Sequence, residues 1–234
     1  MSTFVSAVIV AAGSSTRMGT NGSKQLIPLF GEPVIAYTLR AFEQSTVISE
    51  IIVVCREDDM AAIHEIAGNN AIHKLSQLVK GGASRAESVK NGLAAVSAQA
   101  KYVAIHDGAR PLISVEEISA VTEAAFRNEA ATLGTPVTDT VKVIDDDNRI
   151  IHTPARASLR AVQTPQVFAR EMYEFALDKA GDNLDSFTDD CSLIENLGMQ
   201  IEVVEGSAEN IKLTTPTDVL IAESILRGRK QARS

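Results

Sequence analysis

Short apolar runs alternate with amphipathic stretches over the first half of the chain. The runs are continuous rather than alternating, which is typical of strands that are buried on both faces of a parallel sheet. The predicted strands are Val5–Val10, Ile51–Val54, Leu75–Val79 and Tyr102–Ile105. The predicted helices are Pro33–Phe42, Asp58–Ala67, Ser84–Val96 and Val115–Asn128. This order of elements predicts an α/β fold, with a mainly parallel sheet, right-handed crossovers and helices on both faces.

The rhythm changes after Leu133. Two β-like runs follow, Val137–Ile144 and Arg149–Ile151, and they flank the turn-forming segment Asp145–Asn148. The pattern predicts a hairpin arm, residues 137–156, that projects from the sheet. Such an arm either packs on its own domain or is stabilised by a second subunit, and the residues alone leave both arrangements open.

The last third of the chain returns to helical patterns. Helices are predicted at Ala169–Ala180, Thr188–Leu197 and Pro216–Leu226, with a strand at Ile201–Val204. Thr215 is a candidate N-cap in front of Pro216. The sequence shows no internal repeat and no interdomain linker, so we expect one Rossmann-like domain over residues 1–234.

Composition narrows the possible partners. The chain has 234 residues, 45% of them hydrophobic, with a net charge of −8 and a pI of about 5.1. A broad basic face for nucleic acid is not expected, whereas a local positive patch suits a small anionic ligand. No apolar run has the length of a membrane span, and the N-terminus lacks a signal-peptide pattern. Cys55 and Cys191 form no zinc or disulfide pattern, so the expected compartment is the cytoplasm.

The loop after the first strand is the clearest candidate for ligand binding. It begins with Ala11, Ala12 and Gly13, small residues that let backbone N–H groups approach an anion, and Arg17 and Lys24 follow. The spacing matches neither a Walker A loop nor a Rossmann dinucleotide fingerprint. Taken alone, this loop fits a triphosphate site and a strand–loop turn with solvated cations equally well.

Further segments extend the pattern along the chain. They are Ala11–Gly19 with Lys24 and Gln25; Gly81–Arg85 with Ser88; His106–Pro111; Asp139 and Thr140 with Lys142; Arg156 with Gln163–Gln166; Thr188–Asp190; and Asn210–Lys212 with Pro216 and Asp218. In this order the set resembles the 2-C-methyl-D-erythritol 4-phosphate cytidylyltransferases. The resemblance runs from residue 5 to about residue 220.

This resemblance implies a transfer of CMP from CTP to 2-C-methyl-D-erythritol 4-phosphate, which gives 4-diphosphocytidyl-2-C-methyl-D-erythritol and pyrophosphate. A phosphate monoester has its second pKa near ~6, so it is mostly a dianion at neutral pH and needs no general base. The difficulty is to bring several negative charges together, which is work for cations and backbone donors. The partners that the resemblance implies are CTP and a sugar phosphate.

The resemblance also implies a role for individual residues. Arg17 and Lys24 would stabilise charge on the triphosphate, whereas Arg156 and Lys212 would hold the acceptor phosphate. Thr140 and Arg110 would lie near the acceptor; a strand-edge hydroxyl and a local ion pair are their alternative roles. In the family's dimers the arm brings the residue matching Arg156 close to the other subunit's site, so we expect a homodimer through the arm.

Five positions match family residues that line the cytosine and ribose: Ala11, Ala12, Gly13, Gly82 and Ser88. Gly82 could instead only terminate the third strand. The resemblance implies a divalent cation, normally Mg²⁺, held largely by the triphosphate. Asp107, at the end of the fourth strand, is the candidate protein ligand, or else it caps the following loop. His106 is expected to be structural, because the reaction needs no imidazole.

Two other functions are possible on sequence grounds. Ribitol-5-phosphate cytidylyltransferases form a sister family with similar loops, but Asp139, Thr140 and Lys142 together with the position of Arg156 favour the methylerythritol enzyme. A regulator that binds CTP without turnover is the second alternative. It would need only the residues for the triphosphate, whereas this chain also has a set for an acceptor.

Overall fold

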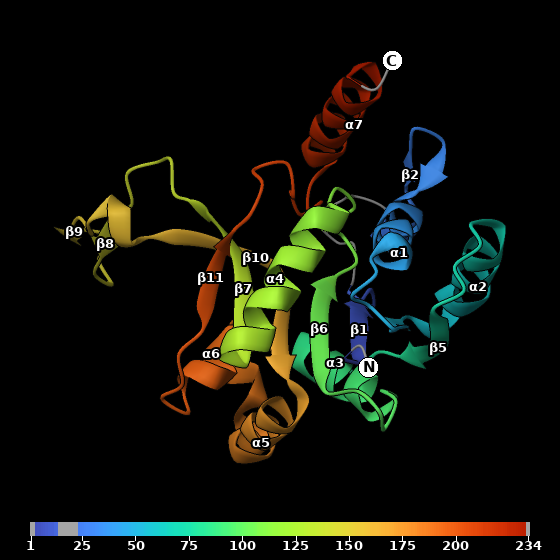
Figure 1. Ribbon diagram of the computed structural model, residues 1–234. Helices are drawn as coiled ribbons and strands as arrows, with labels where there is room; N and C mark the ends of the chain where they lie inside the picture. Colours follow the sequence, from blue (N-terminus) through green and yellow to red (C-terminus); the bar gives the residue numbers. More distant parts are fainter. Residues whose placement is uncertain (1–2, 14–22, 233–234) are drawn as a thin grey trace.

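The computed structural model describes residues 3–13 and 23–232, and its centre is a seven-stranded sheet (Figure 1). The strand order is β11-β7-β10-β6-β1-β4-β5. Within this sheet β10 runs antiparallel to both its neighbours, β6 and β7, and the other pairings are parallel. The strands are β1 (Val5–Val10), β4 (Glu50–Cys55), β5 (Leu75–Lys80), β6 (Tyr102–Asp107), β7 (Ala130–Pro136), β10 (Arg160–Ala169) and β11 (Glu202–Glu205). The predicted α/β fold with a mainly parallel sheet is confirmed.

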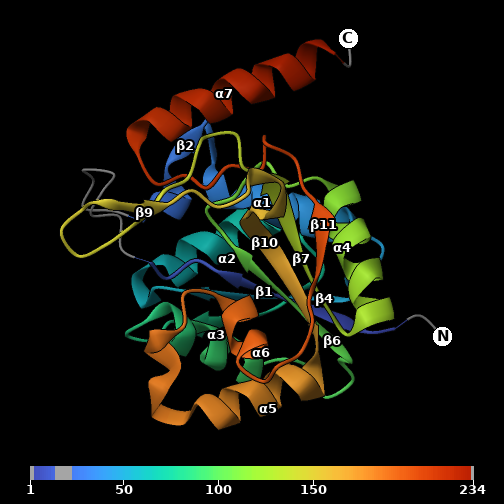
Figure 2. The same ribbon diagram turned by 90° about the vertical axis from the view of Figure 1, so that its left-hand side faces the viewer.

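Helices cover both faces of this sheet. Their bounds are α1 (Val34–Gln44), α2 (Met60–Asn69), α3 (Arg85–Ala94), α4 (Val115–Asn128), α5 (Arg170–Ala180) and α6 (Asp190–Glu195). Figure 2 shows α3, α5 and α6 grouped on one side of the sheet. The other side packs against α1, α2 and α4. Most of the predicted helices and strands are therefore present, with ends that differ by a few residues.

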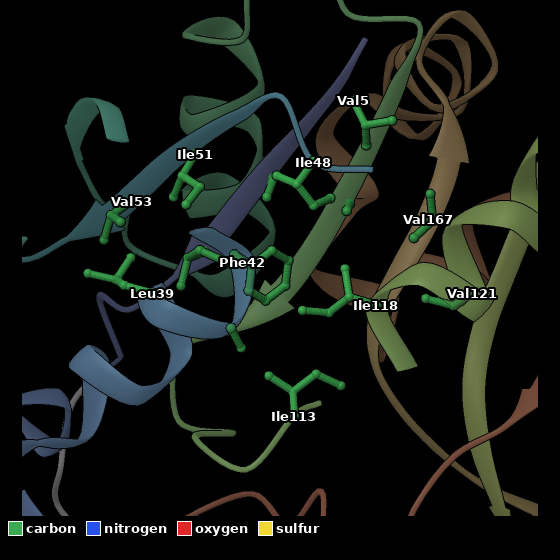
Figure 3. Close-up of a cluster of buried hydrophobic side chains, with 14 of the residues drawn as sticks. Val5, Leu39, Phe42, Ile48, Ile51, Val53, Ile113, Ile118, Val121 and Val167 are labelled. Carbon is green, nitrogen blue, oxygen red and sulfur yellow. The ribbon is translucent and has the colours of Figure 1, made fainter. Parts of the chain in front are cut away.

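Successive residues of the strands supply two separate cores. Ile9, Ile51 and Val53 pack in the cluster with α1 and α4, which Figure 3 shows around Phe42. Val8 and Ile52 belong to the cluster with α3, α5 and α6. Side chains alternate between the faces of a strand, so a parallel sheet covered on both sides needs continuous apolar runs.

The C-terminal helix α7 (Pro216–Gln231) lies apart from both cores (Figure 1). It packs near the short hairpin of β2 (Pro28–Leu29) and β3 (Glu32–Pro33), in a cluster that includes Leu29 and Ala222. A capping box at Thr215 starts the helix, as predicted. The helix continues past its predicted end at Leu226, because Arg229 and Lys230 in its last turn suit a helix C-terminus.

The prediction was wrong around the arm and missed two strands of the sheet. Residues 137–142 are not strand, whereas β7 and β10 are. β7 is rich in alanine and glycine, which have low strand propensity. β10 contains Gln163, Thr164 and Pro165, which suggest a loop. The register shift between Val162 and Gln166 leaves Pro165 outside the hydrogen-bonded ladder, so the strand tolerates it.

The hairpin itself is confirmed as an antiparallel pair of β8 (Val143–Ile144) and β9 (Ile150–His152). One Asp145 carboxylate oxygen accepts hydrogen bonds from the N–H groups of Asp147 and Arg149, at 3.0 and 2.8 Å. Asn148 has a φ of 61°, a left-handed conformation that asparagine tolerates. Figure 1 shows this hairpin to the left of the main sheet, at the end of long connections.

The described residues contain no helix that is long and apolar enough to cross a membrane. Cys55 and Cys191 are both buried thiols without a disulfide partner. Burial raises the pKa of Cys55 to about 11, so this thiol stays protonated at neutral pH.

We predict that Gly92→Ala destabilises the fold through a steric clash. A Cβ atom at Gly92 would lie 2.5 Å from Val8 Cγ1 and 2.6 Å from Val54 Cγ2, where α3 packs on β1 and β4. Urea denaturation should show a loss of about 1–3 kcal/mol. Gly68→Ala is the matched control, because its Cβ meets nothing within 4 Å in α2 and should stabilise by up to about 1 kcal/mol. Equal effects of both substitutions would contradict this packing.

Candidate functional site

A cavity of about 380 Å³ opens at the carboxyl ends of β1, β5 and β6. Its described lining residues are Val10, Ala12, Gly13, Lys24, Gln25, Gly82, Ala83, Ser84, Arg85, Ser88, Asp107, Ala109 and Lys212. β1 and β6 are neighbours in the sheet, but the chain continues from β1 to β4 on the other side. Such a switch in strand order leaves a crevice between loops, which is where open α/β sheets bind ligands.

Two loops approach each other closely at this cavity. A Cβ atom at Gly81 would overlap the Cβ of Ala12, so only glycine lets the loop after β5 meet the loop after β1. The N–H of Gly82 donates to Ser88 Oγ at 3.0 Å, and Ser88 Oγ donates to the Ser84 carbonyl at 2.8 Å. The N–H of Ala83 donates to Glu87 at 2.6 Å. Side chains of α3 therefore hold this loop in shape.

Asp107 lies between two cationic side chains. Its Oδ2 is 2.7 Å from Lys212 Nζ, and its Oδ1 is 3.3 Å from Arg85 Nε. Burial alone would raise the pKa of Asp107, but the charges of Arg85 and Lys212 hold it well below the usual range. The carboxylate is therefore ionised at neutral pH.

Arg85 also contacts a second carboxylate, that of Asp190 at the start of α6. Arg85 Nη2 lies 2.8 Å from Asp190 Oδ2, and Tyr173 donates its hydroxyl hydrogen to Asp190 Oδ1 at 2.6 Å. Burial would lower the pKa of Arg85, but the two carboxylates raise it overall. Sequence reasoning assigned no role to Arg85 or Asp190. The available signal was their position in the motifs Gly81–Arg85 and Thr188–Asp190.

His106 is neutral and structural, as expected. Its Nε2 lies 3.3 Å from the Arg110 carbonyl oxygen, which can only accept, so Nε2 carries the hydrogen. Its Nδ1 then accepts from Thr164 Oγ1 at 3.1 Å, and this oxygen also accepts the N–H of Asp107 at 3.0 Å. Complete burial lowers the pKa of His106 to about 3.

The loop that carries Lys212 is anchored on the strand β10. Asn210 Nδ2 donates to the Thr164 carbonyl at 3.0 Å, and Arg110 Nη1 donates to the Asn210 carbonyl at 2.6 Å. Gln163 Nε2 donates to the Ser207 carbonyl at 2.9 Å. The Gln163–Gln166 motif therefore fixes the position of Lys212 relative to Asp107, although none of its residues is among the described lining residues of the cavity.

The cavity brings together seven of the residues singled out in the sequence: Ala12, Gly13, Lys24, Gly82, Ser88, Asp107 and Lys212. Ala11 is not among these lining residues. It is buried directly after β1, where its N–H donates to the Val54 carbonyl of β4 at 2.7 Å. Arg110 is not among the described lining residues, because its guanidinium group donates to the Asn210 carbonyl instead. Arg17 lies outside the described residues.

Arg156 and Thr140 lie elsewhere in this chain. Arg156 Nη2 donates to Thr140 Oγ1 at 3.0 Å, on the connections to the β8–β9 hairpin. Both side chains are exposed, and neither lines the described part of the cavity. In this chain the two residues contact each other, and the described cavity lining that contains Lys24 and Lys212 does not include them.

The strand order and the cationic crevice are those of a nucleotide-binding α/β enzyme. The family model of 2-C-methyl-D-erythritol 4-phosphate cytidylyltransferase matches residues 5–228. The chain belongs to this family of nucleotidyltransferases.

Individual relatives agree over the whole chain. A curated 2-C-methyl-D-erythritol 4-phosphate cytidylyltransferase from Caldanaerobacter subterraneus subsp. tengcongensis is 44% identical, over 95% of this chain and 99% of its own length. The crystal structure of 4-diphosphocytidyl-2C-methyl-D-erythritol synthase from Anaerococcus prevotii is 34% identical, with a TM-score of 0.84 over 96% of this chain and 99% of that chain. A third relative, the cytidylyltransferase from Thermus thermophilus, is 30% identical with a TM-score of 0.76, over 97% of this chain and 100% of that chain.

We predict that His106 makes the fold sensitive to acid. Its pKa falls from 6.5 to about 3 on folding, so the unfolded chain binds this proton first and stability drops as the pH falls below 6.5. The loss should reach roughly 2 kcal/mol at about pH 5. Asp107 acts only at lower pH, because its ordinary pKa is 3.8. Urea denaturation of His106→Gln should show a flatter pH dependence between about pH 5 and 6.5. An unchanged slope would contradict the neutral, buried imidazole.

Proposed function

We propose that this protein transfers CMP from CTP to 2-C-methyl-D-erythritol 4-phosphate, giving 4-diphosphocytidyl-2-C-methyl-D-erythritol and pyrophosphate. The observation that carries the proposal is a single cavity lined by both Lys24 and Lys212. These are the residues whose family counterparts serve the donor triphosphate and the acceptor phosphate. A protein that only senses a nucleotide has no need of the second group.

The acceptor is its own nucleophile in this proposal. Its phosphate is mostly a dianion at neutral pH, because the second pKa of a phosphate monoester is near ~6. One phosphate oxygen attacks the α-phosphorus of CTP, the bond to the β-phosphate breaks, and pyrophosphate leaves with the bonding electron pair. The chain therefore has to supply position and positive charge, not a base.

Lysine and backbone groups supply both needs. Lys24 would neutralise charge on the triphosphate as the pentavalent phosphorus forms, and Lys212 would orient the attacking phosphate. The pairing of Lys212 with Asp107 at 2.7 Å holds this ammonium group at the cavity wall before the substrate arrives. Arg17 is proposed to act beside Lys24. The backbone at Gly82, which lines the same cavity, would contact the cytosine base.

A Mg²⁺ ion is part of the proposal. Asp107 is the carboxylate among the described lining residues, and it is ionised, as a Mg²⁺ ligand must be. The described residues contain no cluster of three or more metal-binding side chains. Mg²⁺ keeps several waters and binds substrate phosphates, so the proposal needs only this one carboxylate from the protein. When bound, Mg²⁺ would offset phosphate charge and orient the triphosphate.

We further propose a homodimer in which the arm completes the partner's site. Ile144, Ile150 and Ile151 of the β8–β9 hairpin are 50–64% exposed, although such side chains are stabilised by burial. Arg156 and Thr140 belong to the same arm and do not line the described part of the cavity of their own chain. A two-fold dimer would bury the isoleucines and bring Arg156 to the partner's acceptor phosphate. We also propose that the enzyme works in the cytoplasm.

We predict that pyrophosphate release from CTP depends on 2-C-methyl-D-erythritol 4-phosphate. The measurement is a coupled pyrophosphate assay with this acceptor, with ribitol 5-phosphate and with neither. The methylerythritol substrate should give a kcat/KM at least about tenfold higher than ribitol 5-phosphate. Preference for ribitol 5-phosphate would assign the sister activity instead. CTP binding without pyrophosphate release from any acceptor would leave the regulatory function.

Lys24→Ala tests the proposed role of the cavity lysine in the same assay. Loss of the cation should lower kcat by about 10²–10³-fold while the protein remains folded. Lys90→Ala removes a lysine from the exposed face of α3, away from the described cavity lining, and should leave kcat unchanged. A comparable loss in both variants would show that the measured effect is not local.

We predict that two inactive variants restore activity when they form mixed dimers. In a dimer of Lys24→Ala and Arg156→Ala chains, one site keeps both the native Lys24 and the partner's native Arg156. Co-expression should yield about a quarter of the wild-type activity, because half of the randomly formed dimers are mixed and each has one intact site. No recovery in mixed dimers would mean that Arg156 serves the site of its own chain.

A further inference from the structure

The carboxylate of Asp190 has no part in the reaction proposed above, although it contacts Arg85, which lines the candidate site. Its side chain is 3% exposed, and its two oxygens are occupied by Arg85 Nη2 at 2.8 Å and by the Tyr173 hydroxyl at 2.6 Å. Asp190 is not among the described residues that line the 380 Å³ cavity. It lines a neighbouring cavity of about 330 Å³, and Arg85 forms part of the wall of both.

Arg85 is shared unequally between two carboxylates. Its contact with Asp190 is shorter, at 2.8 Å, than its contact with Asp107, at 3.3 Å. A guanidinium group at the wall of a triphosphate site is attracted to phosphate oxygens with the same fork geometry that it uses for carboxylates. Some other group must hold Arg85 back if it is to remain on Asp107 when a nucleotide binds.

Asp190 is itself held firmly enough to do this. The N–H of the next residue, Cys191, donates to Gln166 Oε1 at 3.1 Å, and Gln166 Nε2 donates to Asp189 Oδ2 at 2.7 Å. The ring of Tyr173 stacks on Phe168 at a centroid distance of 5.0 Å. The start of α6 is thus attached to β10 and to the buried core on that face.

We propose that Asp190 is a positioning residue: it ties Arg85 to the cavity wall, so that Arg85 orients Asp107 instead of binding the nucleotide phosphates. The inference rests on the proposed function, because it takes the cavity to be the triphosphate site. Lys212 is then free to leave Asp107 for the acceptor phosphate, while Arg85 keeps the Asp107 carboxylate in place.

This role has a kinetic signature that a purely structural role lacks. Arg85 lies between two carboxylates, Asp107 in the wall of the 380 Å³ cavity and Asp190 outside it, and Lys24 and Lys212 are the other cations of this wall. Asp190→Asn removes one negative charge and releases Arg85 toward the cavity, so the ground-state attraction for a triphosphate increases. The orientation of Asp107 is lost at the same time. CTP should therefore bind at least as tightly while turnover falls.

The test compares Asp190→Asn with wild type in the cytidylyl-transfer assay and in calorimetric titration with CTP and Mg²⁺. We expect kcat to fall by about 10–100-fold, with the Kd for CTP equal to or below that of wild type. Tyr173→Phe removes only the hydroxyl that donates to Asp190, so kcat should fall by about two- to fivefold with no rise in the Kd for CTP. This second variant keeps the test decisive even if Asp190→Asn folds poorly. A raised Kd, or a kcat within about twofold of wild type for both variants, would overturn the proposal.

Leu193→Ala is the matched control for structural damage. Leu193 is a buried residue of the same helix and lines the same neighbouring cavity as Asp190. This variant should lower the melting temperature and leave kcat and the Kd for CTP unchanged. If it reproduces the pattern of Asp190→Asn, the effect belongs to α6 packing and the proposal fails.

A crystal structure of Asp190→Asn separates this inference from the proposed function. In crystals soaked with CTP, the contact of Arg85 Nε with Asp107 Oδ1, at 3.3 Å in the native chain, should be lost in the variant, with Arg85 turned toward the phosphates in the cavity. An intact contact would overturn the positioning role whatever the enzyme's substrate. Wild-type protein without transferase activity would instead overturn the proposed function, and the position of Arg85 would still decide the inference.

Discussion

The ion pairs of Asp107 with Arg85 and Lys212 are the interaction on which the site depends. They join the end of β6, the first turn of α3 and the loop before α7, segments that are far apart in the sequence. Each charge is partly buried, so removing one partner would leave the other as an uncompensated charge and would destabilise the fold. Their buried position also keeps them from being screened by salt as surface pairs are. The cavity wall is therefore pre-formed and charged before any ligand binds.

The sheet makes this meeting possible. Parallel strands end at the same edge, and the reversal of strand order between β1 and β6 leaves the crevice open. The antiparallel strand β10 lies next to β6 and supplies Thr164, which supports both His106 and the backbone of Asp107. Thr164 also accepts a hydrogen bond from Asn210, so one residue of β10 aligns the two segments that carry Asp107 and Lys212. Polar residues in a buried strand are thus the support of the site.

The charge of the chain and the charge of the site have opposite signs. The net charge is −8, but lysine and arginine side chains at the cavity outnumber the carboxylate among its described lining residues. A local positive region in an acidic protein favours small anions. A large polyanionic surface would also be repelled at long range by the net negative charge of the protein. The exposed isoleucines of the β8–β9 hairpin are a separate feature, and their burial in a dimer would stabilise an arm that has few contacts of its own.

The sequence by itself determined most of the fold and the chemical type of the site. Continuous apolar runs specify a sheet covered on both faces, and α4 begins and ends where the pattern of Ser114 to Asn128 predicts. The ordered motifs predicted the family that the family model and the relatives show. Only the tertiary structure decided that Gln163–Gln166 belongs to a strand, because its burial and pairing with β6 and β7 override local propensity. It also decided that Arg110 supports Asn210 and that Asp190 stands behind Arg85. These two contacts join residues 100 and 105 positions apart, and local patterns contain no information on which distant side chains will meet.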